Sequence, residues 1–470
     1  MDRIHPWRMS QHALGPEVAV GRRVARPRSW SVRPMDLAAI VVGNGLLIAA
    51  MWVRHGGLGE LDSVAGILTA AGQLTALFGT YLVLIQLVLM SRSPWLDQLF
   101  GMDRLASAHR WVGFSCVWLL VAHGALTTVG YGLGDGQGVI GEAWTLVATY
   151  PFVLWAVVGL GLFIAVAVSS MRAARRRLSY ETWHALHLYA YLAVALTFAH
   201  QLVVGADFAD DPVARLYWIG LYVVTAATIL IFRFGQPIRV SLRHRLRVAN
   251  VVREGPGVVS IYLTGRDLDQ LAIRSGQYFV CRFLTRDDWW RGHPFSISAA
   301  PNGEWLRITV KDLGDDTARL QRLAVGTPVY VEGPYGALTG ARRTRSRVLL
   351  VAGGIGITPL RALLEELPVR PGEMTLVYRA SRPKDLVFRD ELDAIARLNG
   401  ATIHYIVGRR GSSGVADEPL GPASLGTLVP DVRERDVFLC GPISMMDAVQ
   451  RSLRVLGVPA AQIHSERFAY

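Results

Sequence analysis

The chain has few cysteines and nothing that resembles an export signal. Its 470 residues include only Cys116, Cys281 and Cys440, which are far apart in the sequence. This small number excludes a disulfide framework and a four-cysteine iron–sulfur cluster within the chain. Residues 1–34 are rich in arginine and proline and lack an apolar core, so they do not fit a cleavable secretory signal. We expect them to form a cytoplasmic, partly disordered basic arm.

Apolar residues are abundant but unevenly distributed. Hydrophobic residues make up 51% of the chain, and the mean hydropathy is +0.30. The excess lies before Phe232, where six apolar segments are long enough to span a bilayer. The segments are Met35–Val53, Val64–Met90, Ala108–Gly130, Ala143–Ser170, Thr182–Val204 and Val213–Phe234. The sequence therefore predicts a multi-pass membrane protein with the lipid bilayer as a partner.

Basic charge alternates along the membrane half. The net charge is +12, and arginines gather before the first segment, after the second, after the fourth and after the sixth. The other three loops have few basic residues. Because basic loops stay on the cytoplasmic side, the pattern predicts a plasma-membrane protein with both termini in the cytoplasm. This placement explains most of the excess charge, so nucleic acid is not expected as a partner.

Histidines lie inside two of the apolar segments, where their cost marks them as functional candidates. The third segment contains His109 and His123, and the fifth contains His187 and His200. Both segments run in the same direction, so the four side chains fall at two matched depths, about 20 Å apart. Neutral imidazole is a suitable axial ligand for haem iron. The pattern predicts two bis-histidine haems, in which His109 pairs with His187 and His123 pairs with His200.

Helical phase supports half of this pairing. His123 follows His109 by fourteen residues, which is about four turns and keeps both side chains on one face. His200 follows His187 by thirteen residues, or about 3.6 turns, so a π-bulge or a strong tilt would be needed. The spacing from His184 to His200 is not a whole number of turns either, so His184 does not resolve the mismatch and is interpreted as structural. The alternative for any one histidine is a hydrogen bond between helices.

After Pro237 the pattern changes to short strands separated by turns, which predicts a small antiparallel barrel. Within it, RGHPFSIS (Arg291–Ser298) offers a cation, a flat ring and two hydroxyls. Val310–Leu320 adds a lysine and a threonine that opens a helix, and Glu332–Gly336 adds a glycine–proline turn. Helix N-termini bind phosphate, so these segments suit a flat phosphorylated ligand. The alternative for each segment alone is an ordinary turn.

From Arg347 onward, strands alternate with helices. This alternation predicts an open parallel sheet that binds a nucleotide at the carboxyl ends of its strands. GGIGITP (Gly353–Pro359) is expected to form the glycine-rich turn between a buried strand and a helix. Pro359 takes the place of the third glycine of the usual GxGxxG pattern, and proline suits the first turn of a helix.

The order of these features resembles the ferric reductase and NADPH oxidase superfamily, and the soluble half alone resembles the ferredoxin–NADP reductase family. The resemblance rests on six spans with paired histidines, followed by HPFSIS, GGIGITP and CGP, and covers Met35 to Tyr470. It implies a multi-domain membrane protein with a six-helix bundle, an antiparallel β-barrel and an α/β parallel-sheet domain. The implied domains are a basic arm (1–34), a transmembrane haem domain (35–236), an FAD-binding barrel (237–340) and an NAD(P)-binding domain (341–470).

The resemblance also implies roles for individual residues. His109 with His187 would ligate an inner b-type haem, and His123 with His200 an outer one. FAD would be bound by Gln277, Tyr278, His293, Pro294, Phe295, Ser296, Lys311 and Thr317. NADPH would be bound by Gly353, Gly354, Gly356, Thr358, Pro359, Cys440, Gly441 and Pro442.

Three residues are candidates for a catalytic role under the same resemblance. Ser296 would approach the reactive nitrogen of the flavin, and Cys440 would lie near the nicotinamide. Phe468, in the C-terminal HSERF, would cover the flavin ring, with Tyr470 as the alternative. His293 stands where many soluble reductases have an arginine, which points to the membrane branch of the superfamily.

Arg379, Ser381 and Arg382 follow the second strand of the predicted parallel sheet. They suit a 2′-phosphate because guanidinium groups bind phosphate in a fork. No acidic residue that could read a ribose hydroxyl occurs before Asp385. The cluster therefore favours NADPH over NADH, and the alternative is that these arginines face solvent.

These features predict an NAD(P)H-dependent oxidoreductase. Electrons from cytosolic NADPH would pass through FAD and two haems to a small-molecule acceptor beyond the membrane. Oxygen, reduced to superoxide, and ferric chelates are the two candidate acceptors, and a quinone or a partner protein is a third. The outer loops Gly130–Glu142 and Gly205–Asp211 contain no clear metal-ligand cluster, and His55 is the only histidine in the outer loops. No obligate protein partner is inferred.

The alternative from a different class is a haem-binding membrane module without turnover. Such a module would not need both a flavin motif and a nicotinamide motif.

Overall fold

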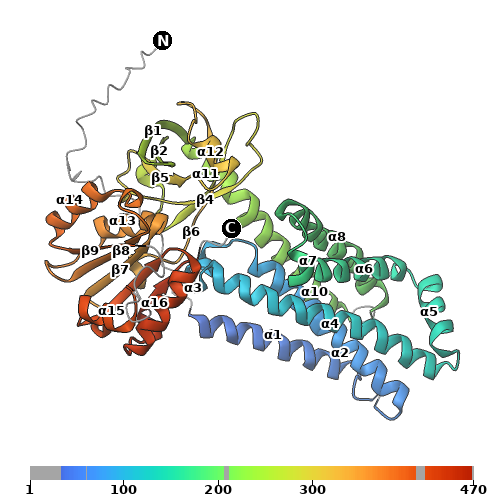
Figure 1. The fold of residues 1–470 in the computed structure, drawn as a ribbon. Helices are drawn as coiled ribbons and strands as arrows, with labels where there is room; N and C mark the ends of the chain where they lie inside the picture. Colours follow the sequence, from blue (N-terminus) through green and yellow to red (C-terminus); the bar gives the residue numbers. More distant parts are fainter. Residues whose placement is uncertain (1–32, 60, 206–210, 409–418, 468–470) are drawn as a thin grey trace. The chain divides into compact units, whose positions relative to one another are not determined.

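The computed structural model describes residues 33–59, 61–205, 211–408 and 419–467 of the chain. Contacts divide the chain between two compact units (Figure 1). The membrane unit comprises the described residues of 30–99 and 104–234, and the soluble unit comprises residues 100–103 and those from 235 onward. The predicted basic arm, 1–34, lies almost wholly outside the described residues.

Six helices among the described residues are long and apolar enough to span a membrane. The first five are α1 (Pro34–Arg54), α2 (Val64–Leu89), α4 (Met102–Gly134), α6 (Val153–Ser170) and α8 (Tyr180–Val204). The sixth runs from α10 (Pro212–Ile229) through the π-helical turn η1 (Leu230–Gly235) into α11 (Gln236–His244). Short helices α3 (Pro94–Phe100), α5 (Gly138–Thr149) and α7 (Arg172–Arg175) lie between the spans.

The fourth predicted segment, Ala143–Ser170, is not one continuous helix. Its first part belongs to α5, and α6 starts only after Phe152, whose φ is +66°. Pro151 explains the break, because a proline disfavours helical backbone in the residue before it, and Tyr150 is extended. The 18 residues of α6 are still enough to cross the apolar part of a bilayer.

The core of the membrane unit includes a cluster shared by α1, α2 and α10. Trp52 of α1, Tyr81 of α2 and Trp218 of α10 are all buried there. The indole nitrogen of Trp52 donates to Gln73 Oε1 at 2.7 Å, so this polar atom is satisfied inside the apolar region. A second cluster joins α2, α4, α6 and α8 through Val83, Cys116, Phe163 and Ala193.

Glycines let α2 and α4 approach each other closely. A Cβ added to Gly72 would lie 2.7 Å from Thr127 Cγ2, and one added to Gly130 would lie 2.9 Å from the backbone nitrogen of Thr69. Neither position leaves room for a side chain. Small residues at such crossings allow the backbone contact that holds helices together in lipid.

Two antiparallel sheets form the first part of the soluble unit. In the described residues, one sheet has the order β1 (Arg247–Gly255), β2 (Val258–Thr264), β5 (Leu306–Lys311), and the other β4 (His293–Ser296), β3 (Tyr278–Phe283), β6 (Val329–Tyr335). Isolated bridges from Ile297 to Ile308 and from Arg247 to Pro328 connect them. Side chains from both sheets, including the fully buried Ile261 and Phe279, share one core. This is the arrangement expected of a small barrel.

A parallel sheet forms the second part. Among the described residues its order is β11 (Ile463–Ser465), β10 (Arg435–Cys440), β7 (Arg347–Gly353), β8 (Met374–Ala380), β9 (Thr402–Val407). Helices α13 (Ile357–Glu366) and α14 (Arg389–Asn399) pack on one face, and α15 (Pro422–Leu428) and α16 (Ile443–Val455) on the other. The predicted fold class, a helical membrane bundle followed by antiparallel strands and an α/β domain, is confirmed.

Candidate functional site

The parallel sheet reverses its strand order between β7 and β10. From β7 the chain continues outward to β8 and β9, whereas β10 and β11 lie on the opposite side. Ligands of open α/β sheets bind at the carboxyl ends of the strands at such a point. Here β7 ends at Gly353 and β10 ends at Cys440, so the structure brings the two predicted nucleotide motifs together.

The backbones of these motifs touch. A Cβ on Gly356 would lie 2.4 Å from the carbonyl oxygen of Cys440, and one on Gly441 would lie 3.1 Å from Gly353 Cα. Gly354 has a φ of +53°, which favours glycine. Together these features leave a backbone-lined turn against which a pyrophosphate can lie.

Helix α13 begins directly after this turn. Thr358 and Pro359 lie in its first turn, and Thr358 Oγ1 donates to the carbonyl of Ile355 at 3.0 Å. Proline costs nothing in the first turn, because its missing N–H would have no partner there. The helix dipole at this end of α13 favours an anion.

Cys440 is fully buried at the end of β10. Burial raises the pKa of its thiol, and the nearby Glu466 raises it further. The thiol is therefore protonated at neutral pH and is not a nucleophile. Any role in the reaction must come from contact rather than from thiolate chemistry.

A cavity of about 520 Å³ lies beside the flavin motif. Its wall comes from β4, β5, the turn into α12 (Asp315–Leu320) and the dinucleotide turn. The lining residues are Arg291, His293, Phe295, Thr309, Lys311, Leu313, Gly314, Asp315, Asp316, Thr317 and Ile355. The volume is typical of a small-molecule site. Because Ile355 belongs to GGIGITP, the flavin motif and the dinucleotide turn share one cavity.

His293 gives the cavity wall a polar atom that lacks a partner. Its Nε2 is buried and has no hydrogen-bond partner among the residues that the structure describes. Burial lowers the pKa of His293, and the neighbouring Arg291 and Arg319 lower it further, against the opposing effect of Asp288. The ring stacks on Phe295 with centroids 6.0 Å apart. A flat ring beside an unpartnered imidazole nitrogen fits a flavin and its phosphates.

The other predicted flavin residues fall into two groups. Lys311 and Thr317 line the cavity, and Thr317 Oγ1 holds the turn by accepting from Leu313 N at 2.8 Å. Pro294 and Ser296 lie on β4 beside the lining residues. Gln277 and Tyr278 are not in the cavity wall: Gln277 Oε1 accepts from Arg274 N, and the Tyr278 ring lies 5.8 Å from that of Tyr335.

Thr309 lines the cavity but was not among the site residues predicted from the sequence. Arg307, Thr309 and Lys311 alternate along β5, and alternate residues of a strand point to the same face. This alternation of polar residues in the sequence could have identified the face of β5 that lines the cavity. Phe468 and Tyr470, the candidate flavin covers, lie outside the described residues.

The proposed 2′-phosphate cluster is divided in the structure. Arg379 pairs in register with Gly353 and so ends beside the dinucleotide turn. Arg382 forms a fork with Asp385, at 3.0 and 3.1 Å, and this hydrogen bonding lowers the pKa of the carboxyl. Ser381 is exposed. A bound phosphate would therefore compete with Asp385 for Arg382.

In the membrane unit, α4 and α8 bring the first histidine pair together. The ring centroids of His109 and His187 are 5.9 Å apart. Imidazole nitrogens bind first-row metals at about 2 Å, which places two rings on one metal roughly 6 Å apart. His187 Nδ1 lies 3.3 Å from Ser170 Oγ. This hydrogen bond leaves Nε2 of His187 free to bind a metal.

The second pair shows a similar outer contact. His123 Nδ1 lies 3.0 Å from the carbonyl oxygen of Gly72, the usual partner of a metal-binding imidazole. Helix α8 is α-helical throughout and has no π-bulge, so of the two ways in which the phase could be met, a π-bulge or a strong tilt, only the tilt is left. The buried Nδ1 atoms of His109 and His200 have no partner within the described part of the chain.

His184 and His55 occupy other positions. His184 lies 6.5 Å from the Trp183 ring on α8. His55 Nε2 lies 2.8 Å from Asp211 Oδ2, and Asp211 also caps α10 by accepting from Val213 N at 2.7 Å. The hydrogen bond with His55 lowers the pKa of Asp211 to about 2.

Three family models match successive parts of the chain. A ferric reductase like transmembrane component matches residues 75–198, an FAD-binding domain matches 244–339, and an oxidoreductase NAD-binding domain matches 350–451. The chain belongs to the ferric reductase and NADPH oxidase superfamily. Its six apolar helices and the ferric reductase like component make it a multi-pass membrane protein, and its FAD-binding and NAD-binding domains are those of NAD(P)H-dependent oxidoreductases.

The chain is also similar to a reductase subunit, an electron transfer component and a flavohemoprotein over about half its length. It is 30% identical to the glycine betaine monooxygenase reductase subunit of Chromohalobacter salexigens, over 48% of this chain and 64% of that one. It is 30% identical to the toluate 1,2-dioxygenase electron transfer component of Pseudomonas putida, over 48% and 68%. It is 31% identical to a flavohemoprotein of Pseudomonas aeruginosa, over 48% and 58%. This chain therefore covers less than two thirds of the length of the reductase subunit and of the flavohemoprotein.

Proposed function

We propose that this member of the superfamily carries electrons from cytosolic NADPH across the plasma membrane to a small-molecule acceptor, with FAD and two b-type haems as resident cofactors. The observation that carries the proposal is the His109–His187 pair, whose ring centroids are 5.9 Å apart inside the membrane unit. The same chain has a cavity shared by a flavin motif and a dinucleotide turn. A haem module without turnover would need neither part of that cavity.

Each residue group has its own task in this proposal. Bound FAD would supply the conversion of a hydride into single electrons, and bound haem iron would supply one-electron relay. The backbone around Gly353 and Gly441 binds the nucleotide pyrophosphate. His293 and Lys311 would hold the flavin phosphates, and Phe295 and Ser296 would orient the ring system.

The histidines hold the haems at two depths. His109 with His187 would bind the inner haem, and His123 with His200 the outer one. The hydrogen bond between His123 Nδ1 and Gly72 O, 3.0 Å long, orients the ring and leaves Nε2 as the atom that would bind iron. Both termini lie in the cytoplasm in this arrangement, which puts the soluble unit on the side where NADPH is available.

NADPH is the proposed donor because of Arg379 and its position beside the dinucleotide turn. Arg379 pairs with Gly353 across β8 and β7. Its side chain therefore projects from a position beside the dinucleotide turn, where we expect the adenosine half of the nucleotide to bind. Arg382 would join it by exchanging Asp385 for the 2′-phosphate. The proposed acceptor is oxygen or a ferric chelate on the outer side.

An optical experiment on the purified full chain tests the proposal. Under anaerobic conditions, the haem spectrum should be that of a bis-histidine species, and NADPH should reduce it only when FAD is present. Omission of FAD is the matched control. A preparation without haem, or haem reduction that does not depend on FAD, would contradict the proposed path. Oxygen and a ferric chelate, supplied separately, then identify the acceptor.

A further inference from the structure

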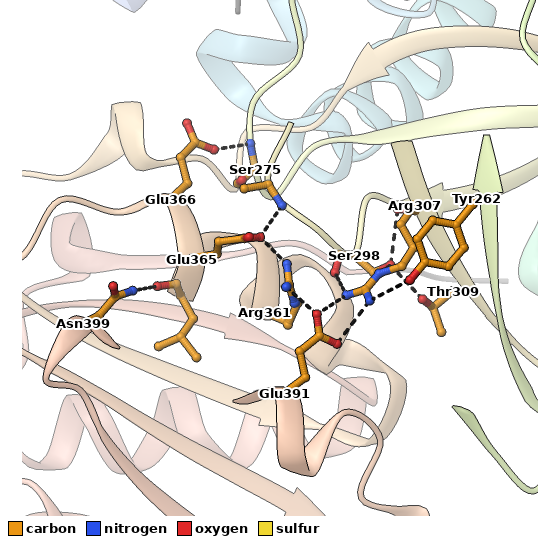
Figure 2. Close-up of polar contacts among 12 residues, drawn as sticks. Tyr262, Ser275, Ser298, Arg307, Thr309, Arg361, Glu365, Glu366, Glu391 and Asn399 are labelled. Atoms are coloured by element: carbon orange, nitrogen blue, oxygen red, sulfur yellow. Dashed lines mark hydrogen bonds and ion pairs between the residues drawn. The ribbon is translucent and has the colours of Figure 1, made fainter. Parts of the chain in front are cut away.

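An arginine lies next to the flavin cavity on the same face of β5 as two lining residues. Arg307 precedes Thr309 and Lys311 on alternate positions of the strand, and its side chain is 4% exposed. Its guanidinium forms two bonds to Glu391 of α14, from Nη1 to Oε2 at 3.1 Å and from Nη2 to Oε1 at 3.0 Å (Figure 2). One strand of the flavin barrel is thereby tied to a helix of the nucleotide domain.

Arg307 also binds the segment that continues the flavin motif. Its Nη2 donates to the carbonyl of Ser298 at 2.6 Å, and its Nε donates to Ser298 Oγ at 3.2 Å. Ser298 is the last residue of HPFSIS and is fully buried. The Ser298 hydroxyl accepts from Thr309 Oγ1 at 2.7 Å. The position of the flavin strand thus depends on the arginine.

Glu391 extends the connection to the helix that starts at the dinucleotide turn. It forms an ion pair with Arg361 of α13, which is 5% exposed and also pairs with Glu365 (Figure 2). Glu365 Oε2 in turn accepts from the backbone N–H of Ala300, at 2.7 Å, just beyond the flavin motif. Ion pairs of Arg307, Glu391, Arg361 and Glu365 therefore connect the flavin motif with the helix that follows the dinucleotide turn.

Buried charges of this kind are costly and add little stability. Arg307 and Arg361 lose nearly all of their solvation, and their attraction to Glu391, which stays 31% exposed, repays this loss only in part. Burial alone would lower the pKa of Arg307, but Glu391 and Tyr262 raise it above its ordinary value, so the residue stays charged. The main effect of these ion pairs is therefore to fix the positions of the strand and the helices that they join.

The backbone at the start of α14 is held by the same arginine. Phe388 precedes the helix with a φ of +64°, which is strained for a bulky residue. The Arg307 guanidinium lies over the Phe388 ring, 4.6 Å from its centroid. This contact fixes the point from which Glu391 projects, less than one turn into the helix.

We propose that Arg307, Glu391 and Arg361 form an ionic bridge that sets the distance and angle between the flavin strand and the dinucleotide turn. They are positioning residues for hydride transfer from the nicotinamide to the flavin, and they do not touch either ring. The inference rests on the proposed function. A displacement of about 1 Å at a reacting centre is enough to slow a reaction roughly 100-fold.

The test compares Glu391→Gln with Asp393→Asn in the full-length protein. Both variants exchange a carboxylate for an amide on α14, but Asp393 bonds to Tyr405 of β9 within the nucleotide domain, at 2.7 Å. In anaerobic stopped-flow measurements with FAD bound, Glu391→Gln should slow flavin reduction by NADPH roughly 10- to 100-fold. The NADPH concentration for half-maximal rate should stay near the wild-type value. Asp393→Asn should leave both quantities unchanged.

Hydrogen exchange on the protein without cofactors supplies a second readout. In Glu391→Gln, the amide of Ala300 should exchange faster, because Arg361 loses its partner on α14 and then holds Glu365, the acceptor of the Ala300 N–H, less firmly. Arg307→Lys should fall between wild type and Glu391→Gln in both measurements, since a lysine keeps the charge but loses the fork. A purely structural role would instead lower FAD content in step with the rate.

Two results would overturn the bridge. One is a wild-type rate of flavin reduction in Glu391→Gln, and the other is unchanged exchange at Ala300. A wild-type protein that binds FAD but is not reduced by NADPH would instead refute the proposed function. In that case the exchange arm still decides whether the bridge couples the two domains.

Discussion

Single residues determine whether the membrane unit can bind a metal porphyrin. His109 and His187 lie on different helices, with ring centroids 5.9 Å apart, and a hydrogen bond to Ser170 orients His187. The contact to Ser170 engages Nδ1 and leaves Nε2 of His187 available. We therefore propose His187 as the ligand, and not His184, which lies one turn earlier on the same helix.

We predict that His187→Ala removes the inner haem and leaves the outer one. Bound haem should fall to about half of the wild-type amount, because an axial ligand is lost from one of two sites. A pyridine haemochrome assay on the purified protein measures this. His184→Ala, made in the same helix, should keep full haem content. Equal haem content in His187→Ala and wild type would reassign the ligand.

His293 gives the soluble unit a pH dependence whose sign follows from its burial. Its pKa lies below the ordinary value of 6.5, so the unfolded chain binds the proton first as the pH falls. The stability contributed by the neutral ring is complete above about pH 6.5 and is lost as the pH falls toward the lower pKa of the folded state. His464, whose pKa burial also lowers, adds to the same trend.

The expected result is a soluble unit that opens more readily at about pH 5.5 than at about pH 7 in the absence of FAD. Hydrogen exchange of the amides in β5, corrected for intrinsic exchange rates, measures the change. In His293→Gln, the difference between the two pH values should shrink but persist, because His464 still titrates. An identical difference in both proteins would show that His293 does not control it.

At the scale of elements, the outer haem site depends on how closely α2 and α4 pack. Gly72 of α2 has no room for a side chain against Thr127, and its carbonyl holds His123. Gly79, two turns later on α2, faces the flexible side chains of Leu119 and Leu120 at 3.1 Å or more. The two glycines therefore make a matched pair, one against backbone and one against movable side chains.

Gly72→Ala should weaken both the helix packing and the outer haem site. Overpacking of this kind costs about 1–3 kcal/mol, and the shift of α2 also moves the partner of His123. Gly79→Ala should cost less and retain haem. Thermal unfolding in detergent and haem content measure the two effects. Equal losses in both variants would mean that the packing at Gly72 has no special relation to the histidine.

The helices and strands could be predicted from the sequence, but some of the contacts between them could not. Apolar length located the six spans and strand alternation located the sheets, because both depend on local pattern. The break before α6 carried its own signal in Pro151, which the apolar run concealed. The bridge of Arg307, Glu391 and Arg361 had no local signal, since Glu391 is 84 residues beyond Arg307 and only folding brings them together.

For the molecule as a whole, the proposal requires that donor and acceptor never meet. The dinucleotide turn belongs to the soluble unit, whereas His123 and His200 lie within the spans that the basic loops orient. Electrons, and neither substrate, must then cross the bilayer. A reductase with both substrates on one side would have no use for two histidine levels about 20 Å apart.

Sealed vesicles test this separation directly. With the purified chain in vesicles loaded with NADPH and FAD, an impermeant ferric chelate outside should be reduced by the molecules whose soluble unit faces inward. The same chelate trapped inside together with NADPH should not be reduced, because donor and acceptor then lie on the same side, and His187→Ala should abolish reduction of the outside chelate while flavin reduction continues. Reduction of the trapped chelate, in the wild type or in His187→Ala, would place electron exit at the flavin, on the side of the donor, and would refute a path across the membrane.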